Sequence, residues 1–139
     1  MADIAITAAS VLASASAQHR KEYNFGYASA TAGQHVYLAT TNLWQLVDSN
    51  AAVTGNELTA LCGITLNGGG ANQPADVCVY DTDFTPGGTL TNGSTVYSST
   101  TAGGITHDVP TTGAFPRILG IAKSTTKMVL NPTASGVVI

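Results

Sequence analysis

Residues 89–132 of this chain consist of short apolar and β-branched segments separated by turn signals. Asn92 and Gly93 form one such signal, because both residue types accept a positive φ. Pro110 and Pro116 form others, since proline fixes φ and lacks a backbone N–H. Four segments between these signals have the length and composition of strands: residues 95–98, 104–109, 117–123 and 127–130. The stretch therefore predicts a β-meander.

A weaker copy of this pattern lies earlier in the chain and indicates an internal repeat. Both copies contain a Gly-x-x-Val-Tyr segment, then Thr-Thr, and later a Gly-Ile pair followed by a loop and another strand. Chance recurrence in a chain rich in Gly, Thr and Val is the alternative interpretation. We expect two related meanders, over about residues 33–82 and 93–132.

The 139 residues are enough for one domain with its own core. We expect an all-β fold, a small barrel or β-sandwich built from the two meanders, with no long helix after residue 20. Residues 1–28 are expected to form an Ala/Ser-rich N-terminal arm and a first strand. Residues 29–139 are expected to form the single β domain that contains the repeat.

Charged residues are scarce, at 9% of the chain, whereas soluble domains contain roughly 25%. Such a chain is expected to cover much of its surface against another molecule. The net charge of -3 argues against nucleic acid as a partner. No apolar run approaches the roughly 20 residues that span a bilayer, and the first residues resemble no secretory signal. We therefore expect no membrane partner and synthesis in the cytoplasm.

The sequence offers little for catalysis. The three histidines are isolated and form no metal-binding motif. His107 and Asp108 are adjacent, but no Gly-x-Ser-x-Gly segment is present to supply a nucleophile. Asp81 and Asp83 lack the further carboxylates of a calcium loop, so we expect a solvated turn there. The sequence predicts no enzyme activity, no catalytic or metal-binding residue and no cofactor.

Candidate partner contacts lie near the N-terminus. Ile4 and Ile6 alternate, as in a strand, within a tract of small residues that is able to lie flat on another surface. This tract is either an arm that becomes ordered on contact or an ordinary first strand of the protein's own sheet.

The densest charge and the densest aromatics of the chain follow directly. Tyr23, Phe25 and Tyr27 alternate and would share one face of a strand, either as core or as an exposed anchor. The candidate partner interface comprises Ile4, Ile6, Arg20, Lys21, Tyr23, Phe25 and Tyr27. Trp44, the sole tryptophan, is a candidate oligomer or stacking surface.

The order of the motifs resembles a known class of proteins. Gly-x-x-Val-Tyr, Ala/Gly-Gly-Ile-Thr, Pro-Thr-Thr-Gly, Arg-Ile-Leu-Gly-Ile-Ala and Leu-Asn-Pro follow one another. This order resembles the small β-rich structural proteins of tailed bacteriophages, namely capsid decoration or cement proteins and head-fibre domains. The similarity is clearest over residues 92–132 and weaker over residues 33–80.

The resemblance implies a virion protein on the outside of the phage head. Such a protein would bind the major capsid protein as a trimer or dimer and stabilise its lattice. One alternative is a fibre or tail β-module. The other is a carbohydrate-binding module that uses Trp44, Tyr37 or Tyr97 for stacking.

Overall fold

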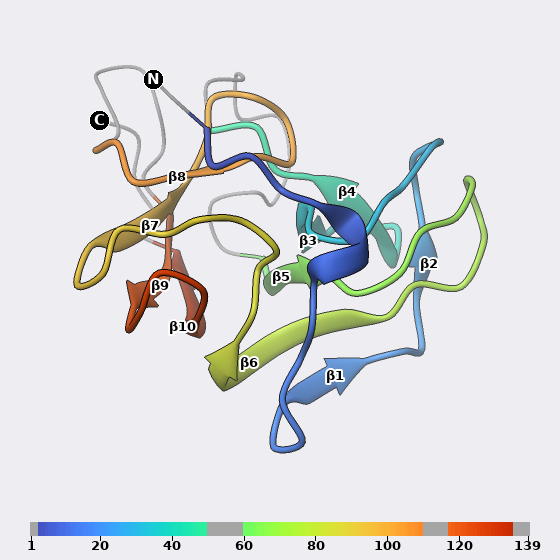
Figure 1. The fold of residues 1–139 in the computed structure, drawn as a ribbon. Helices are drawn as coiled ribbons and strands as arrows, with labels where there is room; N and C mark the ends of the chain where they lie inside the picture. Colours follow the sequence, from blue (N-terminus) through green and yellow to red (C-terminus); the bar gives the residue numbers. More distant parts are fainter. Residues whose placement is uncertain (1–2, 50–59, 110–116, 135–139) are drawn as a thin grey trace.

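The computed structural model describes residues 3–49, 60–109 and 117–134, and almost all of their regular structure is β. The only helical element among them is a short 3-10 turn, η1 (Ala8–Ser10). The strands are β1 (Gln18–Arg20), β2 (Asn24–Phe25), β3 (His35–Leu38), β4 (Leu43–Leu46), β5 (Cys62–Thr65), β6 (Val77–Phe84), β7 (Thr95–Ser98), β8 (Ile105–Thr106), β9 (Arg117–Ala122) and β10 (Met128–Ala134) (Figure 1). The predicted all-β class is confirmed.

One sheet contains all ten strands, in the order β2-β4-β3-β5-β6-β10-β9-β7-β8, with β1 added to β6. The sheet is not closed into a barrel, so the barrel is not the architecture that forms. Instead, the turn between β7 and β8 meets β3 and β4 through loop hydrogen bonds. The N–H of His35 donates to the carbonyl oxygen of Gly103 (2.9 Å). The N–H of Gly103 in turn donates to the carbonyl oxygen of Val47 (2.8 Å).

The two halves of the sheet have the same pairing order. The first half runs β4-β3-β5-β6, and the second runs β8-β7-β9-β10 from its outer end to the central β6–β10 pair. Val36 lies opposite Gly63 in the first half, and Val96 lies opposite Gly120 in the second. However, Val36 and Val96 belong to different core clusters. The matching motifs of the two halves therefore face different cores. A duplication of the chain stays a prediction.

The glycine of the shared Gly-Ile pair has a structural cause in both halves. A Cβ on Gly63 would collide with the carbonyl oxygen of Cys78 on β6. A Cβ on Gly120 would collide in the same way with the carbonyl oxygen of Val129 on β10. The neighbouring strand therefore approaches closely at this point, which only glycine permits.

Two clusters of buried side chains form the core. The first lies on one face of the sheet and includes residues from both halves, among them Ile64, Phe84, Val96, Leu119 and Met128. The second lies on the opposite face of the first half only, because adjacent residues of a strand point to opposite faces. It contains Phe25, Ala30, Val36, Trp44, Ala75 and Val77, with Tyr23 and Tyr27 packed against it.

The N-terminal segment crosses the molecule in front of both halves before it reaches β1 (Figure 1). Asp3 bridges to Thr106 of β8, and Leu12 bridges to Thr85 after β6. The side chains of Ile4, Ile6 and Val11 pack against the first core cluster. The segment is thus docked on the protein's own fold.

Candidate interaction surface

The second half of the sheet has an apolar face, formed by β7, β9 and β10, that no layer of the described residues covers. Ile118 and Ile121 of β9 are 43% and 53% exposed on it. In the register of the sheet, the face consists of two rows: Thr95, Ile121 and Val129 in one, and Tyr97, Ile118 and Thr133 in the other. None of these six side chains is charged. We call this set of residues the outer face.

A shallow hollow of about 400 Å³ lies on the outer face. Ile121 and Val129 supply its apolar wall, and Gly120 contributes backbone without a side chain. Lys123 and Asn131 also line it. The hollow is therefore suited to an apolar side chain of a partner with polar groups around it.

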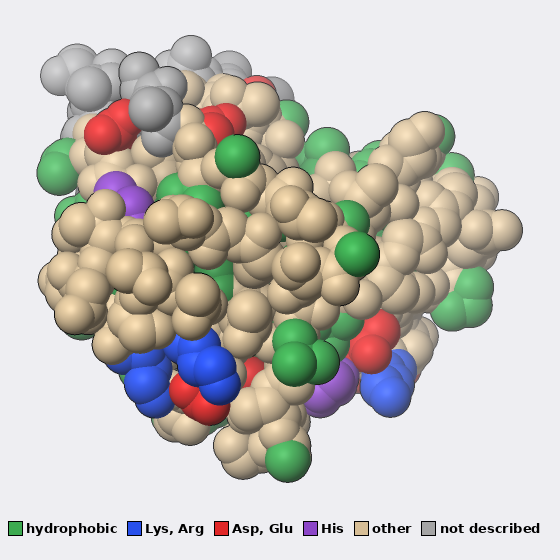
Figure 2. All heavy atoms as spheres, viewed as in Figure 1, with side chains coloured by type: hydrophobic (Ala, Val, Ile, Leu, Met, Phe, Trp, Pro, Cys, Tyr) green, Lys and Arg blue, Asp and Glu red, His purple; other side chains and the backbone are tan. Residues whose placement is uncertain are grey.

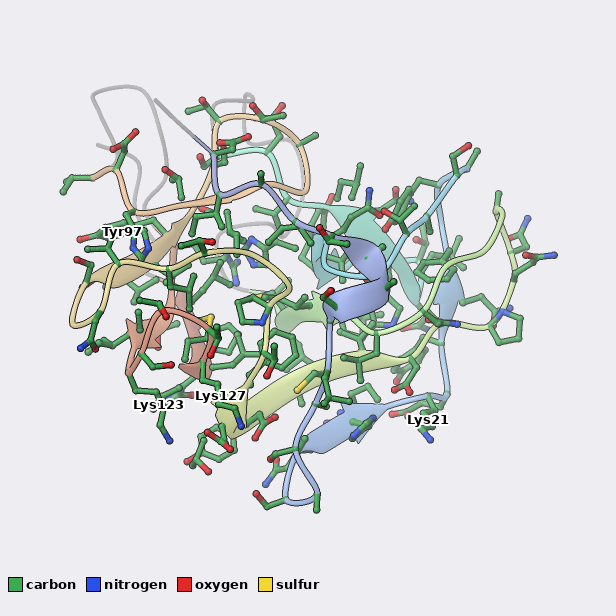
Figure 3. The ribbon with its side chains drawn as sticks, viewed as in Figure 1. Lys21, Tyr97, Lys123 and Lys127 are labelled. Carbon is green, nitrogen blue, oxygen red and sulfur yellow. The ribbon has the colours of Figure 1, made fainter. Side chains whose placement is uncertain are left out.

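A compact charge cluster flanks the outer face at the turn between β9 and β10. Lys123 and Lys127 lie side by side there, whereas Lys21 lies on the other side of the molecule (Figure 3). The Nζ atoms of Lys123 and Lys127 lie 3.2 and 3.0 Å from the carboxylate of Asp83. The hydrogen bonds from Lys127 and then Lys123 hold the pKa of Asp83 below its ordinary value. Figure 2 shows this cluster as blue side chains around red ones.

The first two residues of the predicted interface are engaged within the chain. Ile4 and Ile6 are half-buried against the first core cluster. An arm that waits for a partner would leave these side chains in solvent. Their packing instead gives the segment a role in holding the two halves together.

The predicted basic pair lies on the surface at β1. Arg20 donates a hydrogen bond to Glu22 (2.9 Å), and this bond lowers the pKa of the Glu22 carboxyl. The Nζ of Lys21 lies 4.0 Å from the carboxylate of Asp76. Arg20 also lines a hollow of about 770 Å³ beside β1, together with Leu61 and other residues.

The aromatic part of the predicted interface belongs to the second core cluster, with Phe25 inside it and Tyr23 and Tyr27 packed against it. Phe25 has no exposed surface and contacts Tyr27 edge-on, with 5.7 Å between ring centroids. Tyr23 packs edge-on against Trp44 at 6.5 Å. Burial raises the pKa of Tyr27, whose hydroxyl donates to the side-chain carbonyl of Gln34 (2.7 Å).

The prediction of Trp44 as a stacking surface is wrong, because its ring is fully buried. It belongs to the second core cluster, beneath the aromatic residues of the N-terminal region. A sugar has no access to it in this structure. The carbohydrate-binding alternative therefore loses one of its three candidate stacking residues.

Sequence reasoning placed Ile118 and Ile121 in a strand and missed that both are exposed. The feature of the sequence that pointed to this exposure is the spacing of the two isoleucines, which lie three positions apart. Residues three apart share a face of a strand only where the pleat is interrupted. Gly120 lies between them, and the register of the β7–β9 pair shifts at this position. A glycine inside a strand pattern therefore marked a bulge that turned both isoleucines outward.

A buried polar group lies between the two halves, away from any surface. Arg117 of β9 donates to the Cys62 Sγ (2.7 Å) and to the carbonyl of Ala60 (3.1 Å). His35 is fully buried, and no hydrogen bond to either ring nitrogen is formed within the described residues. Burial, together with the charge of Arg117, lowers the pKa of His35 to about 3. This group joins the halves and offers no accessible nucleophile.

His107, the histidine adjacent to Asp108 in the sequence, holds a loop. The N–H of Thr91 donates to the Nε2 of His107 (2.9 Å), so this ring is tied to the loop before β7. Within the described part of the chain, no three His, Cys, Asp or Glu residues are placed to hold a metal ion.

Comparison with known proteins gave no match to any family model, curated protein or solved structure. A search of the described residues for a helix long and apolar enough to cross a membrane found none.

Proposed function

We propose that this protein is a structural protein of a bacteriophage head, which binds the outside of the shell and stabilises the lattice of the major capsid protein. The outer face carries this proposal. Ile118 and Ile121 are 43% and 53% exposed on it, and no layer of the described residues covers them, although the same strands bury their other face in the first core cluster. An exposed apolar sheet face is typical of a surface that binds another protein.

The composition of the outer face suits a permanent contact. Covering exposed isoleucines with a partner lowers the free energy by roughly 25 cal/mol for each Å² of apolar area removed from water. The threonines in both rows add hydroxyl groups for hydrogen bonds at the margin. The face is also rigid, because its side chains stand on paired strands and need little ordering on binding.

A shell presents many copies of the same site, so each contact need not be strong. A dimer or trimer of this protein would hold neighbouring capsid subunits together, because the first contact raises the effective concentration for the next. Binding to the assembled shell but not to its separated subunits would then stabilise the shell by mass action.

The test is co-sedimentation of the purified protein with mature, undecorated phage heads, and with unexpanded heads as a second target. We expect saturable binding to mature heads at a fixed ratio to capsid subunits. The double variant Ile118→Asp/Ile121→Asp is expected to lose at least tenfold in affinity. Leu61→Asp is the matched control, because Leu61 is 40% exposed but lies outside the outer face.

Failure of the parent protein to bind either kind of head would overturn the proposal. Equal binding by the double variant and by the parent would remove the outer face as the contact surface. Circular dichroism of each variant ensures that a loss of binding is not a loss of fold.

A further inference from the structure

Residues 3–14 lie in a groove bordered by glycines and backbone, and by the side chains of the first core cluster, against which Ile4, Ile6 and Val11 pack. Four glycines from three separate loops border it: Gly33 before β3, Gly87 and Gly88 after β6, and Gly104 before β8. A Cβ on Gly33 would lie 2.5 Å from Ile6, one on Gly87 would lie 2.7 Å from the Thr7 carbonyl oxygen, and one on Gly88 would collide with the Ala5 carbonyl oxygen. The groove is therefore shaped for an extended chain.

Backbone hydrogen bonds fix the segment along this groove. The N–H of Ile4 donates to the Ile105 carbonyl, and that of Thr7 donates to the Gly87 carbonyl, each at 2.9 Å. Leu12 and Thr85 exchange two bonds of 2.9 Å, as in an antiparallel strand pair. The segment thus covers an edge of β8 that would otherwise be open to another strand.

Both ends of the segment are held by carboxylates. Asp81 of β6 is fully buried and accepts hydrogen bonds from the N–H (2.7 Å) and the hydroxyl of Ser14. At the other end, Asp3 accepts a hydrogen bond from the hydroxyl of Ser99. Without Ser14, the Asp81 carboxylate would keep, among the described residues, the hydrogen bond from the N–H of Asp83 (3.0 Å). A buried carboxylate with so few donors is costly, so the groove requires an occupant.

The link between this segment and the rest of the chain is weak. Ala15 and Ser16 form an exposed turn before β1, closed by a 3.2 Å hydrogen bond from the Ala17 N–H to the Ser14 carbonyl. Asp3 carries the one charge of the segment and residues 4 to 14 carry none, so repulsion between two such segments is small. Every contact named above depends on the segment's own residues and not on the covalent link. The same contacts are available to the same segment of another copy.

We propose that two copies of the chain exchange residues 3–14, each segment docking in the groove of the other copy. The exchanged dimer and the closed monomer share these contacts and differ mainly in the turn at Ala15 and Ser16. The dimer therefore forms in proportion to the concentration of the chain. This inference concerns the protein in solution and does not depend on binding to a shell.

The first test asks whether the groove takes the segment from outside. A protease cleavage sequence replaces Ala15 and Ser16, so that the chain folds intact and is cut afterwards. A fluorescent synthetic peptide of residues 1–17 is then added in excess, and its incorporation is followed by anisotropy. We expect saturable incorporation by the parent peptide and at least a tenfold loss with Ile4→Asp/Ile6→Asp. The peptide with Leu12→Asp is the matched control, because the Leu12 side chain is 66% exposed.

The second test uses the uncut chain. Light scattering after size exclusion should show a dimer fraction that rises with concentration. Deletion of Ala15 and Ser16 should raise that fraction severalfold, because a shortened turn hinders return of the segment to its own groove. Ile118→Asp should leave the dimer unchanged, which separates exchange from association through the outer face. Failure of the parent peptide to enter the cut protein, or a monomer at every concentration in both uncut chains, overturns the proposal.

Discussion

The two halves of the sheet share a pairing order but differ in what lies on their second face. In the first half, that face is buried under Phe25 and its aromatic neighbours, with Trp44 fully enclosed. In the second half, the corresponding layer is absent from the described residues, and Ile118 and Ile121 are exposed. The same order of strands thus gives one half that is covered on both faces and one half that is free to bind. The covering layer, and not the sheet itself, makes the difference.

The largest expected effect comes from removing the layer over the first half. Phe25→Ala should lower the free energy of unfolding by about 3–5 kcal/mol, as for other fully buried aromatic side chains. Ile121→Ala should change it by less than about 0.5 kcal/mol, because the side chain is mostly in solvent. Urea unfolding of both variants measures the contrast. A cost for Ile121→Ala close to that of Phe25→Ala would mean that the outer face is already covered in the free protein.

The next effect concerns the junction between the halves. His35 lies in the first half beside Arg117 of the second, and its pKa is lowered from 6.5 to about 3. Between these values the unfolded chain binds a proton that the folded chain does not, so stability falls as the pH drops. The slope rises toward about 1.4 kcal/mol for each pH unit below pH 6.5, which makes the loss about 2 kcal/mol from pH 6.5 to 4.5. Urea unfolding across this range measures it.

The control for the junction is His35→Gln, which has no titrating ring. Its stability should depend on pH less steeply than that of the parent over the same range. Equal slopes for the two proteins would show that His35 does not carry the acid sensitivity. Carboxyl groups that titrate in this pH range contribute equally to the slopes of the two proteins, so their contribution cancels in the difference.

The shared Gly-Ile pair allows the similarity of the halves to be measured. Gly63→Ala and Gly120→Ala should each cost about 1–3 kcal/mol, because a methyl group would press against the neighbouring strand. Gly70→Ala is the control, since the space around Gly70 leaves its added Cβ at ordinary contact distances, 3.7 Å or more. Thermal unfolding of the three variants gives the comparison. A cost at only one of the two strand glycines would show that the halves do not share this close approach.

The smallest effect is expected at the charge cluster beside the outer face. Asp83→Asn removes the partner of both Lys123 and Lys127, but all three side chains are well exposed. Exposed ion pairs contribute little to stability, so thermal unfolding should change only slightly. The change should shrink further at high salt, where such pairs are screened. A large, salt-independent loss would indicate that the cluster supports the fold of the second half.

Much of the fold was predictable from the sequence. The turn signals located β7 at its observed bounds, β9 to within one residue and the start of β10 to within one residue. Strand composition and turn residues act locally, so they are visible in one sequence. Arg117–Ala122 is an example, because its apolar residues lie between Pro116 and the Ser-Thr-Thr turn.

The site was less predictable, because exposure depends on which layer covers which face. Phe25 and Ile121 are both large apolar residues in strands, yet the first is fully buried and the second is 53% exposed. The glycine in the pattern around Ile121 indicates a bulge, but it does not show whether another layer covers that face of the strand. The N-terminal segment shows the same limit, since only the distant glycines of its groove show where it docks. A further prediction from the sequence, that residues 136–139 close the sheet by pairing with the N-terminal region, concerns residues that the structure does not describe.

Oxidative footprinting of the protein, free and bound to mature heads, tests the role of the outer face most directly. Hydroxyl radicals label exposed side chains, and mass spectrometry reports the extent at each residue. We predict that Ile118, Ile121 and Tyr97 become protected on binding, while Leu61 and Leu12 are labelled as in the free protein. Unchanged labelling of the two isoleucines in the bound protein would contradict the assignment of the outer face as the shell-binding surface.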